Sequence, residues 1–105
     1  MKEISVKKLK ELQDGNEDSQ LIDVREPHEY EICNINGELI PVGDVVQKAD
    51  QVSRDKMVVV HCRSGARSAN VIRILEMRYN LDNLYNLKGG ILKYADEIDP
   101  SLEKY

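Results

Sequence analysis

Short apolar runs alternate along the chain with segments in which apolar residues recur every three or four positions. The apolar runs are residues 20–24, 57–60 and 84–87. Runs of this length that are rich in branched aliphatic residues predict strands buried on both faces of a sheet. The turn signal Asn36-Gly37 precedes a further extended piece at residues 38–42, which Pro41 restricts to an edge or an end of the sheet.

The segments between these runs predict helices. Ser5 is a candidate N-cap for a short amphipathic helix that ends at residues 14–16, and Pro27 stands in the first turn of a second helix. Further helices are predicted over residues 44–52, 69–79 and 91–98. Apolar residues, Met77 among them, cover most of the surface of the helix over residues 69–79, so we expect it to pack deeply against the sheet.

Helices and strands that alternate with short connections indicate an α/β fold. We predict a single domain over residues 1–105 with three α/β/α layers, in which helices cover both faces of a central, mostly parallel sheet of about five strands. The length suffices for one hydrophobic core and is too short for two. Ligands of such sheets bind beyond the carboxyl ends of the strands, which is where we expect the functional site.

Composition and charge narrow the classes of function. The chain is 41% hydrophobic, with 15 basic and 19 acidic residues and a formal net charge of −4, which is typical of a soluble globular domain and argues against a general nucleic-acid binder. No apolar run resembles a signal peptide or a membrane span, so we expect a cytoplasmic protein without a membrane partner. The cysteines Cys33 and Cys62 and the two histidines match no zinc-ligand spacing, and we expect no metal.

Cys62 stands where a buried strand is predicted to end and a helix to begin. Backbone N–H groups at a helix N-terminus lack intrahelical partners and carry the positive end of the helix dipole. Gly65 permits the loop to curl into a nest, a concave arrangement of N–H groups that binds anions. A thiol that faces such a nest loses its proton more readily, and the thiolate is the nucleophile.

The neighbours of Cys62 extend this hypothesis. Arg63 and Arg67 add positive charge that would stabilise both a thiolate and an anionic substrate. Ser68 is a candidate to cap the following helix or to donate its hydroxyl to the sulfur. The alternative is a buried structural cysteine, which has no need of a glycine and two arginines in the next five positions.

A carboxylate inside an apolar run must be paired or hydrogen-bonded. We therefore interpret Asp23 as a structural residue that either caps the next helix or pairs with Arg25 or another arginine. The side chain of His61 should point to the opposite face of the strand from that of Cys62, as a hydrogen-bonded core histidine. Cys33 is expected to pack without a chemical role.

These features resemble a rhodanese-like sulfurtransferase domain over nearly the whole chain. The resemblance is carried by LIDVREPHEY (21–30), the apolar strand, CRSGARS (62–68) and NLKGGILKYADEIDPSLEKY (86–105). The last segment and ICNINGELIPV (32–42) are similar to the rhodanese domain fused to adenylyltransferases that activate sulfur-carrier proteins.

The resemblance implies roles for the site residues. Cys62 would be the persulfide-forming catalytic cysteine, and the buried pair of Asp23 and Arg25 would support the active-site loop. That loop comprises the catalytic cysteine and the residues Arg63, Ser64, Gly65, Ala66 and Arg67, followed by Ser68.

The implied activity is that of a thiosulfate sulfurtransferase. Cys62 would take the outer sulfur of thiosulfate or a protein persulfide, N–H groups of residues 63–67 would hold it, and a thiol or cyanide acceptor would remove it. Arg67 would bind the anionic donor. The resemblance implies no metal or organic cofactor, and it admits a desulfurase or a sulfur-carrier protein as partner.

Two alternatives stay open on the sequence. Cysteine-dependent phosphatases and arsenate reductases share the nucleophile, but the phosphatases place five residues between cysteine and arginine, whereas four separate Cys62 from Arg67. The second alternative is a persulfide carrier or interaction module without turnover of its own.

Overall fold

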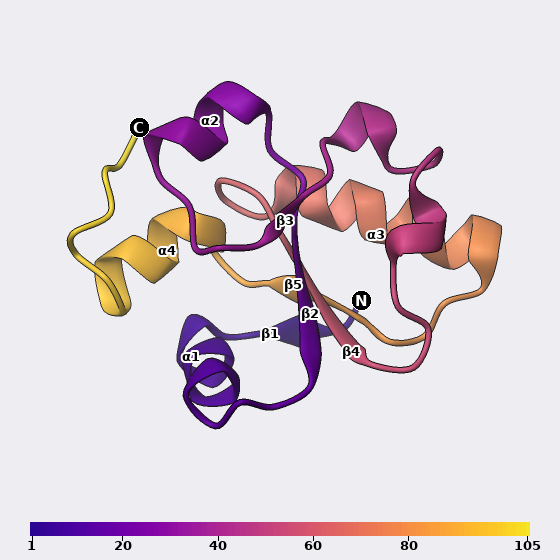
Figure 1. Cartoon of the computed structure of the whole chain (residues 1–105), viewed down its shortest axis with the longest axis horizontal. Coiled ribbons are helices and arrows are strands. Elements are labelled where there is room, and N and C mark those ends of the chain that lie inside the picture. Colours follow the sequence, from indigo (N-terminus) through magenta and orange to yellow (C-terminus); the bar gives the residue numbers. More distant parts are fainter.

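Five parallel strands form one sheet in the order β1-β5-β4-β2-β3. The computed structural model describes residues 1–105 (Figure 1). The strands are β1 (Glu3–Ile4), β2 (Ser19–Asp23), β3 (Glu38–Leu39), β4 (Met57–His61) and β5 (Leu84–Leu87). The helices are α1 (Val6–Asp14), α2 (Pro27–Ile32), α3 (Ala66–Tyr79) and α4 (Gly90–Glu97). The predicted α/β class and the number of strands are therefore confirmed.

Apolar side chains fill both faces of the sheet. On one face, Val58 and Val60 of β4 belong to a core with α3 and the segment between β3 and β4. On the other face, Val59 belongs to a core with α1 and α4. All three valines are fully buried, as expected for a central strand whose successive side chains point to opposite faces.

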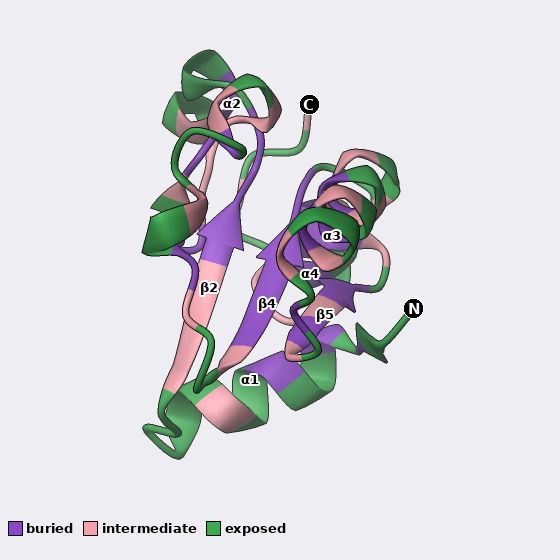
Figure 2. Ribbon diagram, turned by 90° about the vertical axis from the view of Figure 1, so that its right-hand side faces the viewer, coloured by how far each residue is buried: buried purple, intermediate pink, exposed green.

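The carboxyl ends of the central strands gather polar side chains at one edge of the sheet. Asp23 of β2 is the register partner of His61 at the end of β4, and Asn86 of β5 is the partner of Val60. Figure 2 shows β2 and β4 pointing toward α2, which lies beyond this edge. The C-terminus of the chain reaches the same region (Figures 1 and 2).

The predicted helix over residues 44–52 is wrong. The structure has two short 3₁₀ helices instead, Val42–Asp44 and Ala49–Gln51. The β-branched pair Val45 and Val46 lowers helix propensity, and only Val45 of the two is buried. This segment packs on the core through Val45 and Val52 and does not form one regular amphipathic helix.

Two further expectations differ from the structure, and one strand is additional. Helix α3 begins at Ala66 rather than at residue 69, because Gly65 takes the N-cap position with a left-handed backbone (φ 119°). Met77 is 86% exposed, so the apolar face of α3 is narrower than its composition suggested. Strand β1 was not predicted, because a two-residue strand carries no periodicity.

No helix of the structure combines the length and the apolarity that a membrane crossing needs.

Helix α4 begins directly against the loop that follows β4. The N–H group of Ile91 donates to the carbonyl of Cys62 (3.0 Å), and that of Leu92 donates to the carbonyl of Arg63 (3.1 Å). Gly90 makes this approach possible, since a Cβ atom there would lie 2.6 Å from the carbonyl carbon of Arg63 and 2.8 Å from the carbonyl oxygen of Cys62. Its backbone is also left-handed, with φ 61°.

We predict that Gly90→Ala destabilises the protein and distorts the cysteine loop. Overlap with the loop backbone and a left-handed alanine together should lower the free energy of unfolding by about 2–4 kcal/mol, measured by urea titration. Gly43→Ala is the matched control, because a Cβ atom at Gly43 meets nothing within 4 Å. A Gly90→Ala protein as stable as the control would contradict this account of the contact.

Candidate active site

The sulfur of Cys62 lies in a ring of hydrogen-bond donors. Cys62 directly follows β4, is 1% exposed, and accepts N–H bonds at Sγ from Gly65 (3.1 Å) and Ser68 (3.4 Å). The hydroxyl oxygen of Ser68 is also 3.4 Å from Sγ. The start of α3 thus directs donors at a buried thiol, as the strand-loop-helix arrangement of the sequence predicts.

These donors decide the protonation of the thiol. Burial by itself raises the pKa of Cys62, but hydrogen bonds from the side chain and backbone of Ser68 and from the amides of Gly65 and Ser64 outweigh it and lower the pKa below its ordinary value. Hydrogen bonds to a charged group favour its charged form. The loop therefore favours a thiolate, which is the nucleophilic form of cysteine.

Asn86 connects β5 to this arrangement. The hydroxyl of Ser68 donates to its Oδ1 (2.6 Å), and its Nδ2 donates to the carbonyl of Gly65 (3.1 Å). Of the two roles considered for Ser68, the structure shows the contact with sulfur, while Gly65 occupies the N-cap position. Sequence analysis missed Asn86. The only signal was a buried-strand position occupied by a polar residue.

Asp23 and Arg25 form a fully buried ion pair, with Nη2 of Arg25 2.7 Å from Oδ2 of Asp23. Burial opposes the charge of Arg25, but its hydrogen bonds to Asp23 and Tyr105 raise its pKa above the ordinary value, so the guanidinium stays charged. Arg25 also donates to the carbonyl of Cys33 (2.8 Å), which ties the end of α2 to the sheet edge. Both cysteines are free, and Cys33 packs against the apolar core.

His61 is fully buried beside this pair. Its Nδ1 lies 3.3 Å from the carbonyl oxygen of Cys62, and its Nε2 lies 3.5 Å from Oδ2 of Asp23. Burial lowers the pKa of His61, with Asp23 opposing the shift, so the ring is neutral. The contact of Nδ1 fits the expected hydrogen-bonded core histidine, whereas Nε2 is buried without a hydrogen-bond partner.

Arg67, which the resemblance assigns to the anionic donor, is paired with a carboxylate inside the protein. Its guanidinium binds both carboxylate oxygens of Glu29, at 2.6 and 2.8 Å. The hydrogen bond from Arg67 is the main cause of a pKa of about 2 for Glu29, with burial opposing. Sequence analysis missed Glu29, because a glutamate in the first turn of a helix is common and its partner lies 38 positions away.

Tyr105 joins the two charged pairs and contacts the third arginine. Its hydroxyl accepts from Nη1 of Arg25 (2.9 Å) and donates to Oε2 of Glu29 (2.8 Å). Its carbonyl accepts from Nε of Arg63 (2.8 Å), whose guanidinium lies 5.2 Å from the ring centre. The side chains of Ser64 and Ala66, in contrast, are exposed at the rim of the loop.

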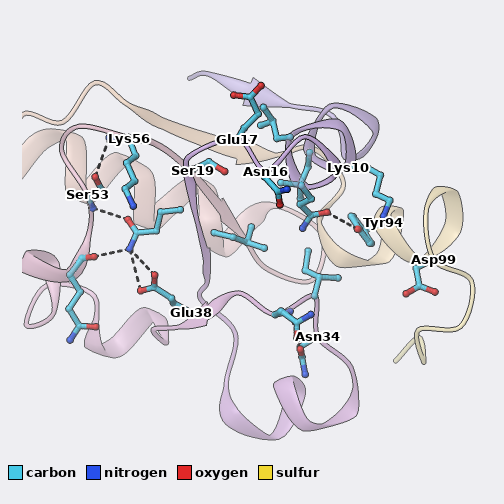
Figure 3. Close-up of a pocket in the computed structure, with 18 residues that line it drawn as sticks. Lys10, Asn16, Glu17, Ser19, Asn34, Glu38, Ser53, Lys56, Tyr94 and Asp99 are labelled. Carbon is cyan, nitrogen blue, oxygen red and sulfur yellow. Dashed lines mark hydrogen bonds between the residues drawn. The ribbon is translucent and has the colours of Figure 1, made fainter.

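The largest hollow in the surface lies elsewhere. A groove of about 950 Å³ runs between α1, β2 and residues 34–38, and its lining does not include Cys62 (Figure 3). At one end, Gln20 binds the carboxylate of Glu38 and the carbonyl of Gln51. The groove is mostly polar and is separate from the cysteine loop.

Comparison with known proteins settles the family. The model of the Rhodanese-like domain family matches residues 5–97. The chain belongs to the rhodanese-like family. It is 37% identical over 101 residues to "Putative sulfurtransferase YtwF" of Bacillus subtilis, with 95% of this chain and 96% of YtwF covered.

The rhodanese-like chain is also similar to a longer curated protein and to a solved structure. It is 36% identical over 96 residues to "Adenylyltransferase and sulfurtransferase UBA4" of Kluyveromyces lactis, with 81% of this chain covered, but it spans only 22% of that protein's length. The crystal structure of a rhodanese-like domain protein from Staphylococcus aureus superposes with a TM-score of 0.83 at 29% identity and covers 100% of this chain and 99% of its own. The fold and the family of the sequence interpretation are thereby confirmed.

We predict that Ser68→Ala raises the pKa of Cys62. The Ser68 hydroxyl lies 3.4 Å from Sγ and can turn its proton from Asn86 toward the sulfur when the thiol ionises. Its removal should therefore shift the pH midpoint of iodoacetamide alkylation upward by about one unit. Ser64→Ala is the control, because it leaves the backbone amide in place and changes only an exposed side chain. Equal midpoints for the two variants would show that the Ser68 hydroxyl does not tune the sulfur.

The Glu29–Arg67 pair should stabilise the fold in a pH-dependent way. The folded pKa of Glu29 is depressed from 4.5 to about 2, so its contribution is present above pH 4.5 and is lost as the pH falls toward 2. At pH 7, Glu29→Gln should cost about 1–3 kcal/mol, a range that allows for solvent screening at the partly exposed Arg67. The difference in urea midpoint between wild type and variant should shrink from pH 5 downward, and a constant difference would refute the assignment.

Proposed function

We propose that this protein is a sulfurtransferase that carries a sulfane sulfur on Cys62 as a persulfide. The observation that carries the proposal is the buried Sγ atom surrounded by the amides of Gly65 and Ser68 and by the Ser68 hydroxyl. Membership of the rhodanese-like family and the name of the relative YtwF support the same reading.

In the first step, the Cys62 thiolate attacks the outer sulfur of the donor. A new S–S bond forms at Sγ while the S–S bond of the donor breaks, and the leaving group keeps the electron pair of that bond. Thiosulfate releases sulfite, and a persulfide of a thiol releases the thiolate. Charge is conserved, since the transferred sulfur carries the negative charge onto Cys62.

In the second step, a nucleophilic acceptor attacks the terminal sulfur of the Cys62 persulfide. The acceptor, a thiol or cyanide, forms a bond to that sulfur, and Cys62 leaves as a thiolate stabilised by the same donors. A covalent intermediate splits one transfer into two easier displacements. Backbone N–H groups of the loop would hold the terminal sulfur in between, and neither step calls for a metal or an organic cofactor.

The physiological donor and acceptor follow from the same chemistry. A reducing, cytoplasmic setting would keep Cys62 and Cys33 as free thiols and would supply protein persulfides. We therefore propose a desulfurase as donor and a thiol or a small sulfur-carrier protein as acceptor. The similarity of residues 32–42 and 86–105 to rhodanese domains fused to carrier-activating adenylyltransferases supports a carrier.

The phosphatase and arsenate reductase alternatives have less support. Four residues between Cys62 and Arg67 make a tighter loop than the phosphatase spacing. The arginine that a phosphatase would use for its substrate is paired with Glu29.

Incubation with thiosulfate or glutathione persulfide should add the mass of one sulfur to Cys62, as detected by mass spectrometry of the intact protein and its peptides. Cys62→Ser should abolish both this adduct and any transfer to cyanide, because no nucleophile remains. Cys33→Ser should retain both and serves as the control. An unmodified Cys62 with either donor would favour the interaction module, and turnover of an aryl phosphate without an adduct would favour the phosphatase.

A further inference from the structure

All three arginines that border the cysteine loop are engaged within the protein. Arg25 forms a buried ion pair with Asp23, and Arg67 donates one hydrogen bond to each carboxylate oxygen of Glu29. The third, Arg63, donates to the carbonyl of Tyr105 and lies against its ring. None of the guanidinium groups that an anionic donor would use is without an internal partner.

The charges of this region also balance. The three guanidinium groups are matched by the carboxylates of Asp23 and Glu29 together with the Cys62 thiolate. A doubly charged donor such as thiosulfate therefore meets no excess positive charge beside the sulfur. What remains for the transferred atom is the set of backbone N–H groups, which suits the single negative charge of a persulfide.

Glu29 is held firmly in place. Its carboxylate accepts hydrogen bonds from Arg67 twice, from the hydroxyl of Tyr105 and from the N–H group of Glu26 (3.1 Å). The residue is 6% exposed. An anion that drew Arg67 away would leave a buried carboxylate with half of these donors, which is costly. Glu29 and an anionic donor thus compete for one guanidinium, and Glu29 has the advantage.

We propose that Glu29 is a specificity-determining residue: by occupying Arg67, it selects the singly charged persulfide of a thiol over doubly charged thiosulfate as sulfur donor. The preference between sulfur donors rests on the proposed sulfurtransferase function. The pairing of Glu29 with Arg67, from which the preference is argued, does not depend on that function. In the favoured reaction, the Cys62 thiolate takes the outer sulfur of the persulfide and the donor leaves as a thiolate.

The electrostatic basis can be tested without sulfur transfer. Cys62 is alkylated with iodoacetate, which is anionic, and with iodoacetamide, which is neutral, and the ratio of the two rates is compared between proteins. Glu29→Gln preserves size and frees Arg67, so it should raise the iodoacetate-to-iodoacetamide ratio about three- to tenfold. The neutral reagent corrects for any change in the pKa of Cys62.

Matched variants isolate the cause. Glu31→Gln removes the same charge from an exposed position of α2 and should leave the ratio at the wild-type value. Arg67→Gln added to Glu29→Gln should cancel the gain, because the freed guanidinium is then gone. An unchanged ratio in folded Glu29→Gln, or a gain that survives loss of Arg67, overturns the inference.

The donor preference is measured on the same proteins. Wild type should form the Cys62 persulfide at least about tenfold more efficiently from the persulfide of 2-mercaptoethanol, which carries a single negative charge, than from thiosulfate, a comparison that needs no variant. Glu29→Gln should narrow this gap mainly through a lower KM for thiosulfate. A wild type that prefers thiosulfate overturns the inference while leaving the proposed function intact. A wild type that accepts sulfur from neither donor overturns the proposed function, and the alkylation ratio then still decides whether Glu29 controls Arg67.

Discussion

The contact between the start of α4 and the loop after β4 is the constraint on which the site depends. Amides of α4 hold the carbonyls of Cys62 and Arg63, and that contact requires the absence of a side chain at Gly90. With these carbonyls bound to α4, the N–H groups of Gly65 and Ser68 are directed at the sulfur. Two helix starts therefore cooperate: one fixes the loop from behind, and the other supplies the donors that lower the pKa of the thiol.

A second set of interactions unites parts of the chain that are far apart in sequence. The buried pair of Asp23 and Arg25 at the end of β2 continues through the hydroxyl of Tyr105 to Glu29, and from there to Arg67 in the first turn of α3. Through Tyr105, the C-terminal segment thus connects the two charged pairs. The C-terminus lies near α2 in Figure 2. Every charge in these two pairs has an opposite partner.

Local patterns explain why much of this could be predicted. A run of β-branched residues, a cysteine, a glycine and a helical period lie next to each other, so strand, loop and helix follow from residues 57–79 alone. Glu29, Asn86 and Tyr105 could not be predicted in this way, since their contacts with the loop depend on how separate elements meet in space. At residues 42–51 the local pattern predicts the wrong structure, because two 3₁₀ helices form where a weak pattern indicated one α-helix. Strand β1 is recognised by its pairing with β5, which two residues of sequence do not reveal.

The sulfur is surrounded mainly by main-chain atoms, whereas the side chains of Ser64 and Ala66 point away from it into solvent. Reactivity and recognition are consequently encoded in different atoms of the same short loop. Drift at these two outward positions can remodel the surface that a visiting protein meets, while the nucleophile keeps its electronic environment. Substitutions at these outward positions can therefore change the protein partner without changing the reaction at the sulfur.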